Sequence, residues 1–261
     1  MLELKDVLTA IRGHDTEARR KAKDRLDQLT MPHWALGRLM DLALELAGIT
    51  GDPAWKPARK AIAVLAADHG VAEEGVSKYP QEVTRQMVAN ICTGGAGINA
   101  LAGQAGCDVR VIDVGVASDT SPFEATGRLW RMLIASGTRN MTKGPAMTRD
   151  QAVASVERGI ESARRLIEEE GVDVLGVGEM GIANTTASSA VISALTGKAP
   201  AETVGPGTGL SAEQVRHKVA VVRRALEVNR PDANDPLDVL AKVGGFEIGG
   251  IAGVVLGAAY Y

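Results

Sequence analysis

The stretch VDVLGVGEMGIANTT, residues 172–186, decides the fold class. Its first half, VDVLGVG, is a short apolar run typical of a buried strand in a parallel sheet. The glycines that follow end the strand, and we expect a helix from about Asn184 to Leu195. A strand that leads through a glycine-rich turn into a helix is part of a βαβ unit, so an α/β fold is predicted.

The same alternation of strands and helices continues on the N-terminal side of this stretch. A first helix is expected from about Pro80 to Gly103, with its proline in the first turn. Strands are expected in KAIAVLAADHG (60–70), VRVIDVGV (109–116) and RMLIAS (131–136). The order of these elements predicts an open, mostly parallel sheet covered by helices on both faces.

Two capping-box patterns mark further helix starts. Thr148 with Gln151 predicts a helix that lasts to about Glu170, and Ser211 with Gln214 predicts one to about Val228. The chain finishes in GGFEIGGIAGVVLGAAYY (244–261), which is predicted to form a helix of small residues without a glycine cap or a charged last turn. An α/β protein usually continues from such a helix into a strand, so we expect a longer form of this chain.

The N-terminal part has a different pattern. Residues 2–48 show apolar spacing typical of helices, and the segment GITGDPAWKPARK (48–60) has the glycine and proline content of a linker. We therefore expect a helical portion of a small domain over residues 1–50 and an α/β substrate-binding domain over residues 51–261.

Composition excludes several classes of function. The net charge is −3 and aromatic residues make up 3%, so neither a polyanion-binding field nor a base-stacking surface for nucleic acid is expected. No apolar run is long enough to cross a membrane, and the first residues lack the core of a signal peptide, so we expect a cytoplasmic protein. Cys92 and Cys107 are interpreted as small hydrophobic residues in a reducing compartment. The histidines His14, His33 and His217 are isolated, so no metal site is predicted.

The ends of the strands carry the candidate chemistry, since ligands of open parallel sheets bind beyond the carboxyl ends of the strands. GVGEMGIANTT has neither the lysine of a P-loop nor the spacing of a dinucleotide fingerprint. It does place backbone N–H groups and two threonines at a helix N-terminus, which suits a single phosphate. The loop VGPGTGL (204–210) and Lys218 on the next helix are the second half of this candidate site.

Alternatives remain for each of these features. The glycines could only turn the chain, and Lys218 could be a solvated surface charge. His69 is either an acid–base group or a histidine that holds its loop by hydrogen bonds. Glu179 would repel a phosphate, so its place in the middle of the glycine loop needs another explanation.

Four long motifs carry a family resemblance. ADHGVAEEGVSKYPQEVTRQMV, GTRNMTKGPAMT, GVGEMGIANTT and KVGGFEIGGIAG, in this order and spacing, resemble the nicotinate-nucleotide–dimethylbenzimidazole phosphoribosyltransferases. The resemblance covers about residues 25–261. It implies a Rossmann-like large domain, a small helical domain built from both chain ends, which is incomplete here, and a homodimer.

The resemblance also implies a reaction. These enzymes transfer the ribose 5-phosphate of nicotinate mononucleotide to a nitrogen of 5,6-dimethylbenzimidazole, with release of nicotinate and inversion at the anomeric carbon. No metal or cofactor takes part. The reaction needs a clamp on the phosphate, a pocket for the flat apolar base and a group that takes the benzimidazole proton.

The residues that match the family motifs are carried over by their positions in this chain. The mononucleotide is assigned to the two glycine loops, the lysine and one asparagine: Met180, Gly181, Ala183, Asn184, Thr185, Thr186, Gly205, Gly207, Thr208, Gly209, Lys218 and Asn140. The benzimidazole pocket is assigned to Tyr79, Pro80 and Met87, with Met180 near the ring.

Glu179 is interpreted as an auxiliary catalytic carboxylate that faces the ribose or the cationic nicotinate ring. The resemblance places the main general-base glutamate of the family beyond Tyr261. One N-terminal loop departs from the family pattern, since MPHWALG (31–37) stands where the family has a PPGSLG-like loop.

The sequence also leaves two other functions open. A non-catalytic or truncated relative that binds a nucleotide or benzimidazole is the second reading. A nicotinamide-dependent oxidoreductase ranks last, because the dinucleotide spacing and an acidic ribose partner are both missing.

Overall fold

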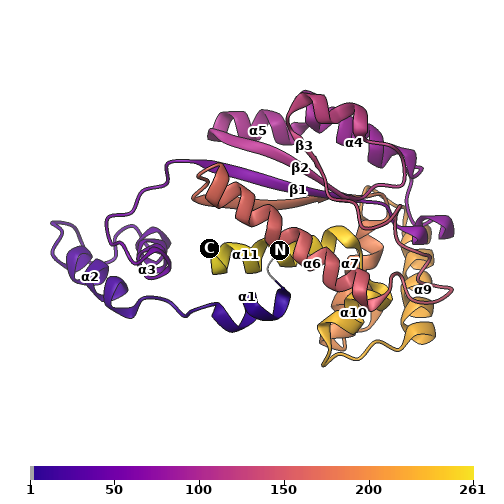
Figure 1. The fold of residues 1–261 in the computed structure, drawn as a ribbon. Helices are drawn as coiled ribbons and strands as arrows, with labels where there is room; N and C mark the ends of the chain where they lie inside the picture. Colours follow the sequence, from indigo (N-terminus) through magenta and orange to yellow (C-terminus); the bar gives the residue numbers. More distant parts are fainter. Residues whose placement is uncertain (1–2) are drawn as a thin grey trace.

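A computed structural model describes residues 3–261 of the chain (Figure 1). Leu2, the first residue of the expected helical stretch, lies outside the described residues. The strands are β1 (Lys60–Ala67), β2 (Cys107–Gly115), β3 (Leu129–Arg131) and β4 (Val174–Met180). The α-helices are α1 (Leu4–Ala10), α2 (Thr16–Asp27), α3 (Arg38–Thr50), α4 (Glu82–Thr93), α5 (Gly97–Ala105), α6 (Arg149–Arg164), α7 (Asn184–Thr196), α8 (Pro200–Thr203), α9 (Ala212–Asn229), α10 (Pro236–Val243) and α11 (Phe246–Tyr260).

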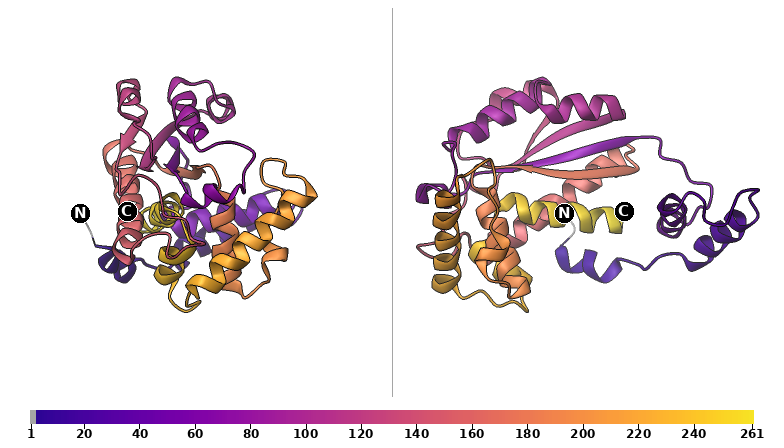
Figure 2. Two further views of the ribbon diagram at one scale, coloured as in Figure 1. Left: turned by 90° about the vertical axis from the view of Figure 1, so that its right-hand side faces the viewer. Right: turned by 180° about the vertical axis from the view of Figure 1, so that it is seen from behind.

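All four strands are parallel and lie in the order β3-β2-β1-β4. Helices α4 and α5 cover one face of this sheet, while α6 and α11 cover the other (Figures 1 and 2). The central strand β1 is the most completely buried one, because it has a strand on each side and helices above and below. The α/β class and the mostly parallel sheet predicted from the sequence are therefore confirmed.

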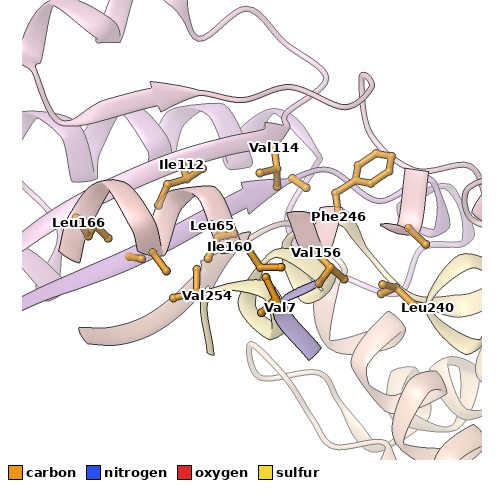
Figure 3. Packing of buried hydrophobic residues seen from close by; sticks show 14 of the residues in the cluster. Val7, Leu65, Ile112, Val114, Val156, Ile160, Leu166, Leu240, Phe246 and Val254 are labelled. Atoms are coloured by element: carbon orange, nitrogen blue, oxygen red, sulfur yellow. The ribbon is translucent and has the colours of Figure 1, made fainter. Parts of the chain in front are cut away.

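The main hydrophobic core lies between the sheet and the layer of α6 and α11 (Figure 3). Leu65 of β1 and Ile112 of β2 contribute to it from the sheet, and Ile160 and Val254 contribute from the two helices. Small residues let α6 and α11 approach closely. A Cβ atom on Gly253 of α11 would lie 1.9 Å from the carbonyl oxygen of Val156 in α6.

The N-terminal helices do not form one packing unit. Val7 of α1 is fully buried in the main core, where α1 contacts α6 and α11. Helices α2 and α3 instead pack on each other around Ala22, Leu44 and Ala47, and they stand apart from the sheet in Figure 1 and in the right panel of Figure 2. The division of the chain at residue 50 stays a prediction.

Two elements differ from the sequence expectation. The helix expected over 80–103 is broken between α4 and α5, where Gly94 adopts a left-handed conformation with φ +90°. The strand expected over 131–136 is wrong in its position, since β3 ends at Arg131. Beyond it, the amides of Met132 and Ile134 still donate to Asp113 and Val114 of β2, at 2.8 and 3.0 Å, without regular pairing.

Both capping boxes are confirmed. The hydroxyls of Thr148 and Ser211 accept from the amides of Gln151 and Gln214, at the first turns of α6 and α9. Within residues 3–261, no helix combines the length and apolarity needed to traverse a lipid bilayer.

Candidate active site

A pocket of about 380 Å³ lies at the carboxyl end of β4. Four segments that are far apart in the sequence form its walls: the loop after the short helix η1 (Gly70–Glu74), the turn from β4 into α7, the loop before α9, and α9 itself. Its lining residues are Val76, Ser77, Glu179, Met180, Gly181, Ile182, Ala183, Asn184, Thr185, Gly207, Thr208, Leu210 and Lys218. The pocket therefore lies where an open parallel sheet is expected to bind its ligand.

The turn between β4 and α7 has a constrained backbone. Ala183 adopts a left-handed conformation with φ +72°, which is unfavourable for a residue with a Cβ atom. The amide of Ile182 donates to the hydroxyl of Thr84 in α4 at 3.0 Å, and this bond ties the turn to the helix above it. The first turn of α7 is thereby directed at the pocket, with the positive end of its dipole toward a ligand.

Lys218 of α9 is a buried cation without an acidic partner in the described part of the chain. Its side chain is 1% exposed, and its Nζ donates to the hydroxyl of Thr185 at 2.6 Å. No carboxylate among residues 3–261 forms an ion pair with it. Burial lowers the pKa of Lys218, because the charged ammonium loses hydration that nothing replaces. An anion bound in the pocket would supply the missing negative charge.

Glu179 lies at the end of β4 on the rim of the same pocket. Its carboxylate accepts a hydrogen bond from the side-chain amide of Asn184, whose own oxygen accepts from the amide of Thr185 at 2.6 Å. The protein around the carboxylate raises the pKa of Glu179 by desolvation, and the negative charge of Glu247 adds to this effect. A carboxyl with a raised pKa can take up or release a proton nearer to neutral pH than an ordinary glutamate does.

A buried histidine–glutamate pair lies close to this rim. His69 follows β1, Glu247 is in the first turn of α11, and the Nε2 and Oε1 atoms are 2.8 Å apart. Both side chains are almost completely buried, at 1% and 0% exposure. The sequence left two roles open for His69, an acid–base group or a residue that holds its loop by hydrogen bonds. Its hydrogen bond to Glu247 supports the second role. Sequence reasoning missed Glu247, although its place in GGFEIGG between pairs of glycines was a signal of close packing.

The pocket brings together nine of the carried-over residues, and the others lie elsewhere. Tyr79 is 50% exposed, and Pro80 next to it is also exposed. Met87 packs against the apolar cluster between the sheet and α4, as does Met180 of the pocket. Thr186 is fully buried and does not line the pocket, and Gly205 and Gly209 are exposed in the loop before α9.

Asn140 lines a different hollow, of about 480 Å³, together with Glu73, Arg139, Lys143, Gly144 and Pro145. Its amide nitrogen donates to Glu74 at 2.7 Å and to Glu73 at 3.3 Å, and its oxygen accepts from the amide of Thr142. These hydrogen bonds use both the nitrogen and the oxygen of the Asn140 side-chain amide. The hollow shares no lining residue with the pocket at β4 and is separate from it.

Sequence reasoning also missed Val76, Ser77 and Leu210, which complete the apolar and polar walls of the pocket. Ser77 stands two residues before Tyr79 in the motif ADHGVAEEGVSKYPQEVTRQMV. Its place in this family motif could have identified it as a site residue. In the described part of the chain, no cluster of three or more histidine, cysteine or acidic side chains has a geometry that could hold a metal ion. Cys92 and Cys107 are free thiols.

The comparisons with known proteins agree with this geometry. The model of a phosphoribosyltransferase family matches residues 11–261. The chain belongs to this family. A relative from Syntrophotalea carbinolica, named nicotinate-nucleotide–dimethylbenzimidazole phosphoribosyltransferase, is 55% identical over 256 residues, which are 98% of this chain and 72% of the relative. A protein of the same name from Desulforudis audaxviator is 56% identical over 248 residues, covering 94% of this chain and 68% of the relative.

A crystal structure from Thermus thermophilus, titled as an enzyme of that name, superposes on this phosphoribosyltransferase with a TM-score of 0.85 at 45% identity. The match covers 93% of this chain and 71% of that one. The family resemblance drawn from four motifs is thus confirmed, as is the α/β fold of the phosphoribosyltransferase.

Proposed function

We propose that this phosphoribosyltransferase transfers the ribose 5-phosphate of nicotinate mononucleotide to 5,6-dimethylbenzimidazole, giving α-ribazole 5′-phosphate and nicotinate. The names of its close relatives support the choice of substrates. The observation that carries the proposal within this chain is the buried, unpaired ammonium of Lys218 at the N-terminus of α7. Such an arrangement fits a phosphate group better than a neutral ligand.

The phosphate binds between the first turn of α7 and the loop before α9. Lys218 turns from the hydroxyl of Thr185 toward a phosphate oxygen, while Thr185 itself donates to another. Gly207 comes close to the lysine, since a Cβ atom at this position would lie 3.4 Å from Nζ. The backbone of the Gly205–Gly209 loop is therefore close enough to Lys218 to contact the same phosphate group. Thr208, which lines the pocket, belongs to the same phosphate site, and Thr186 is assigned to it as the buried residue that follows Thr185 in the first turn of α7.

The reaction takes place at the anomeric carbon of the ribose. The bond from this carbon to the nicotinate nitrogen breaks, and its electron pair returns to the nitrogen, so that the pyridinium ring leaves as a neutral pyridine. A nitrogen of dimethylbenzimidazole forms the new bond from the opposite face, and the proton on its ring is lost to a base. Glu179 is the auxiliary carboxylate that faces the ribose and the positive ring of the mononucleotide, where its charge is favourable.

The benzimidazole binds on the side of the pocket where Met87 and Met180 share one apolar cluster. Methionine side chains adapt to flat aromatic ligands because they are flexible and polarisable. Tyr79 and Pro80, which are exposed in the segment before α4, are assigned to the outer edge of this apolar side, and Asn140, which lines a separate hollow, is assigned to the nucleotide end. The protein acts as a cytoplasmic homodimer without metal or cofactor. Residues 1–50 are assigned to its small domain, although α1 packs on the main core, and residues 51–261 to its substrate-binding domain. Its free thiols are typical of a reducing compartment.

The test is a direct assay with nicotinate mononucleotide and dimethylbenzimidazole, in which α-ribazole 5′-phosphate is detected by chromatography. Lys218→Gln removes the ammonium from the pocket, and we expect it to weaken mononucleotide binding by about ten- to a hundredfold, the effect of one charge-assisted hydrogen bond. Lys198→Gln is the matched control, since this lysine is exposed in the turn after α7. Equal binding of the mononucleotide by the Lys218→Gln and Lys198→Gln variants would refute the phosphate site.

A further inference from the structure

The chain leaves the sheet after β4 through a turn that is supported from outside the sheet. Regular pairing of β4 with β1 ends at Met180, opposite Ala66. Ile182 lies two residues beyond this point and is only 6% exposed, so its amide belongs to a buried residue that the strand ladder no longer serves. A buried N–H group without a partner is costly, and another element therefore has to supply the acceptor.

Thr84 of α4 supplies this acceptor. The residue is 0% exposed, and its hydroxyl accepts from the amide of Ile182 at 3.0 Å, across 98 positions of the sequence. The turn is in close contact on a second side as well, because a Cβ atom on Gly181 would lie 2.3 Å from the carbonyl oxygen of Ala67 at the end of β1. The backbone that leads into α7 is thus held between β1 and α4.

The groups assigned to the phosphate follow directly on this backbone. Ala183, the residue after Ile182, has the left-handed conformation with φ +72°. Thr185 comes two residues later in the first turn of α7, and its hydroxyl accepts from Nζ of Lys218 at 2.6 Å. Thr84 is not among the residues that line the pocket. A displacement of Ile182 would nevertheless move the first turn of α7, because only one residue separates the two.

We propose that Thr84 is a positioning residue for the phosphate group. Its hydroxyl fixes Ile182 and thereby sets the direction in which the first turn of α7 presents its amides and the hydroxyl of Thr185 to the pocket. Thr84 does not touch the substrate; it acts through the turn. The consequence for phosphate binding rests on the proposed function, whereas the control of the turn by this hydroxyl does not.

Two substitutions of Thr84 separate this role from simple packing. Valine keeps the branched shape of threonine and lacks the hydroxyl, whereas serine keeps the hydroxyl and lacks the methyl group. If Thr84 only fills space, Thr84→Val should resemble the unsubstituted protein and Thr84→Ser should be the more affected variant. Positioning by the hydroxyl predicts the opposite order.

The first experiment is amide hydrogen exchange in the whole chain, followed by ¹H–¹⁵N NMR without any ligand. The amide of Ile182 should be protected in the unsubstituted protein and in Thr84→Ser, and it should exchange about tenfold faster or more in Thr84→Val. The amide of Gln214 is the internal control, since it donates to the hydroxyl of Ser211 at 3.3 Å in the first turn of α9. An unprotected Ile182 amide in the unsubstituted protein or in Thr84→Ser would overturn the proposal, whether or not the valine variant folds.

The second experiment is calorimetric titration with two probes, nicotinate mononucleotide and inorganic phosphate. We expect Thr84→Val to raise the Kd for each probe about tenfold, the effect of one hydrogen bond, and Thr84→Ser to raise it by less than about threefold. Thr120→Val is the matched control. Thr120 is also 0% exposed, and its hydroxyl donates to the carboxylate of Asp113 at 2.5 Å, but it follows β2 and does not bond to the turn after β4. Equal Kd values for Thr84→Val and Thr120→Val would contradict a positioning role.

The kinetics of ribosyl transfer distinguish positioning from loss of folded protein. Thr84→Val should raise KM for the mononucleotide about tenfold and change kcat by less than about twofold, because it weakens a binding contact. A variant that is only less stable has fewer active molecules, so its apparent kcat would fall at an unchanged KM, and this result would refute the proposal. Weaker binding of inorganic phosphate by Thr84→Val, with no product from any variant or from the unsubstituted protein, would count against the proposed function alone.

Discussion

Replacing Lys218 by methionine is expected to stabilise the ligand-free protein while it weakens phosphate binding. Methionine has nearly the length of the lysine stem, so the substitution leaves no large cavity at a side chain that is 1% exposed. Replacing a buried ion pair by apolar groups of similar size is often neutral or stabilising by about 1–4 kcal/mol, and within residues 3–261 the ammonium of Lys218 lacks even a partner charge that would offset its burial. Loss of the hydrogen bond to Thr185 costs about 1 kcal/mol. The net gain is therefore about 0–3 kcal/mol, which corresponds to a rise in Tm of up to about 12 °C.

The gain in stability depends on pH in a direction that follows from the lowered pKa of Lys218. The unfolded chain binds this proton more tightly than the folded chain, so the buried ammonium destabilises the fold below the unfolded pKa of about 10.4. This cost disappears as the pH rises through the window between the folded and the unfolded pKa. The advantage of the methionine variant is thus largest near neutral pH and shrinks as the pH approaches 10.

The assay is thermal unfolding, followed by circular dichroism at pH 7 and pH 9.5, without and with nicotinate mononucleotide. Lys198→Met is the control, because the ammonium of this exposed lysine stays hydrated in the folded protein. The ligand should raise the Tm of the unsubstituted protein and of the control, and it should have little effect on Lys218→Met. A methionine variant that melts below the unsubstituted protein at pH 7, or one that the mononucleotide stabilises as strongly, would refute the reasoning.

Two further predictions concern the backbone. Ala183→Gly removes the steric cost of the left-handed conformation at φ +72° and should raise the free energy of unfolding by up to about 1 kcal/mol. Urea denaturation measures this change, and a loss of stability would contradict a strained turn. Gly253→Ala places a methyl group 1.9 Å from the carbonyl oxygen of Val156, so it should destabilise the protein by about 1–3 kcal/mol or more. The control is Gly103→Ala, at a site with no atom within 4 Å, which should be neutral or stabilising in the same assay.

Much of the fold could be predicted because its signals are local. The strands β1 and β2 are apolar runs, since helices cover both faces of the sheet there. The run VDVLGVG does form β4, but the prediction that this strand is buried is wrong, because β4 lies at the edge of the sheet with Val174 and Val177 38% and 41% exposed. The starts of α6 and α9 were predicted correctly from Thr148 and Ser211, because a capping box involves only residues within one turn. The position of β3 was missed for the opposite reason. RMLIAS is apolar enough for a strand, but regular pairing stops at Arg131, opposite Asp113 and two residues before β2 ends, and its own residues do not show where pairing with β2 stops.

The candidate site also has one part that could be predicted from the sequence and one part that could not. The rule that ligands bind beyond the carboxyl ends of parallel strands was enough to expect that Glu179, Thr185 and Lys218 lie close together, and they share one pocket. The pairing of His69 with Glu247 could not be predicted, since the two residues are 178 positions apart. A lone histidine and a glutamate in a helix of small residues show no joint pattern until α11 is packed under β1.

The position of β1 at the centre of the sheet has a consequence for how the protein folds. Its neighbour β4 lies much later in the chain, as the hydrogen bond between residues 115 positions apart, Ala58 and Asp173, illustrates. The carboxylate partner of His69 is later still, by 178 residues, which take about 10–35 s to synthesise at the usual rates of translation. During this interval one edge of β1 is unpaired and the Nε2 atom of His69 lacks the hydrogen-bond partner that it has in the folded protein. Contacts of such sequence separation form slowly, so the pocket is assembled at the end of folding and a half-made chain has no binding site.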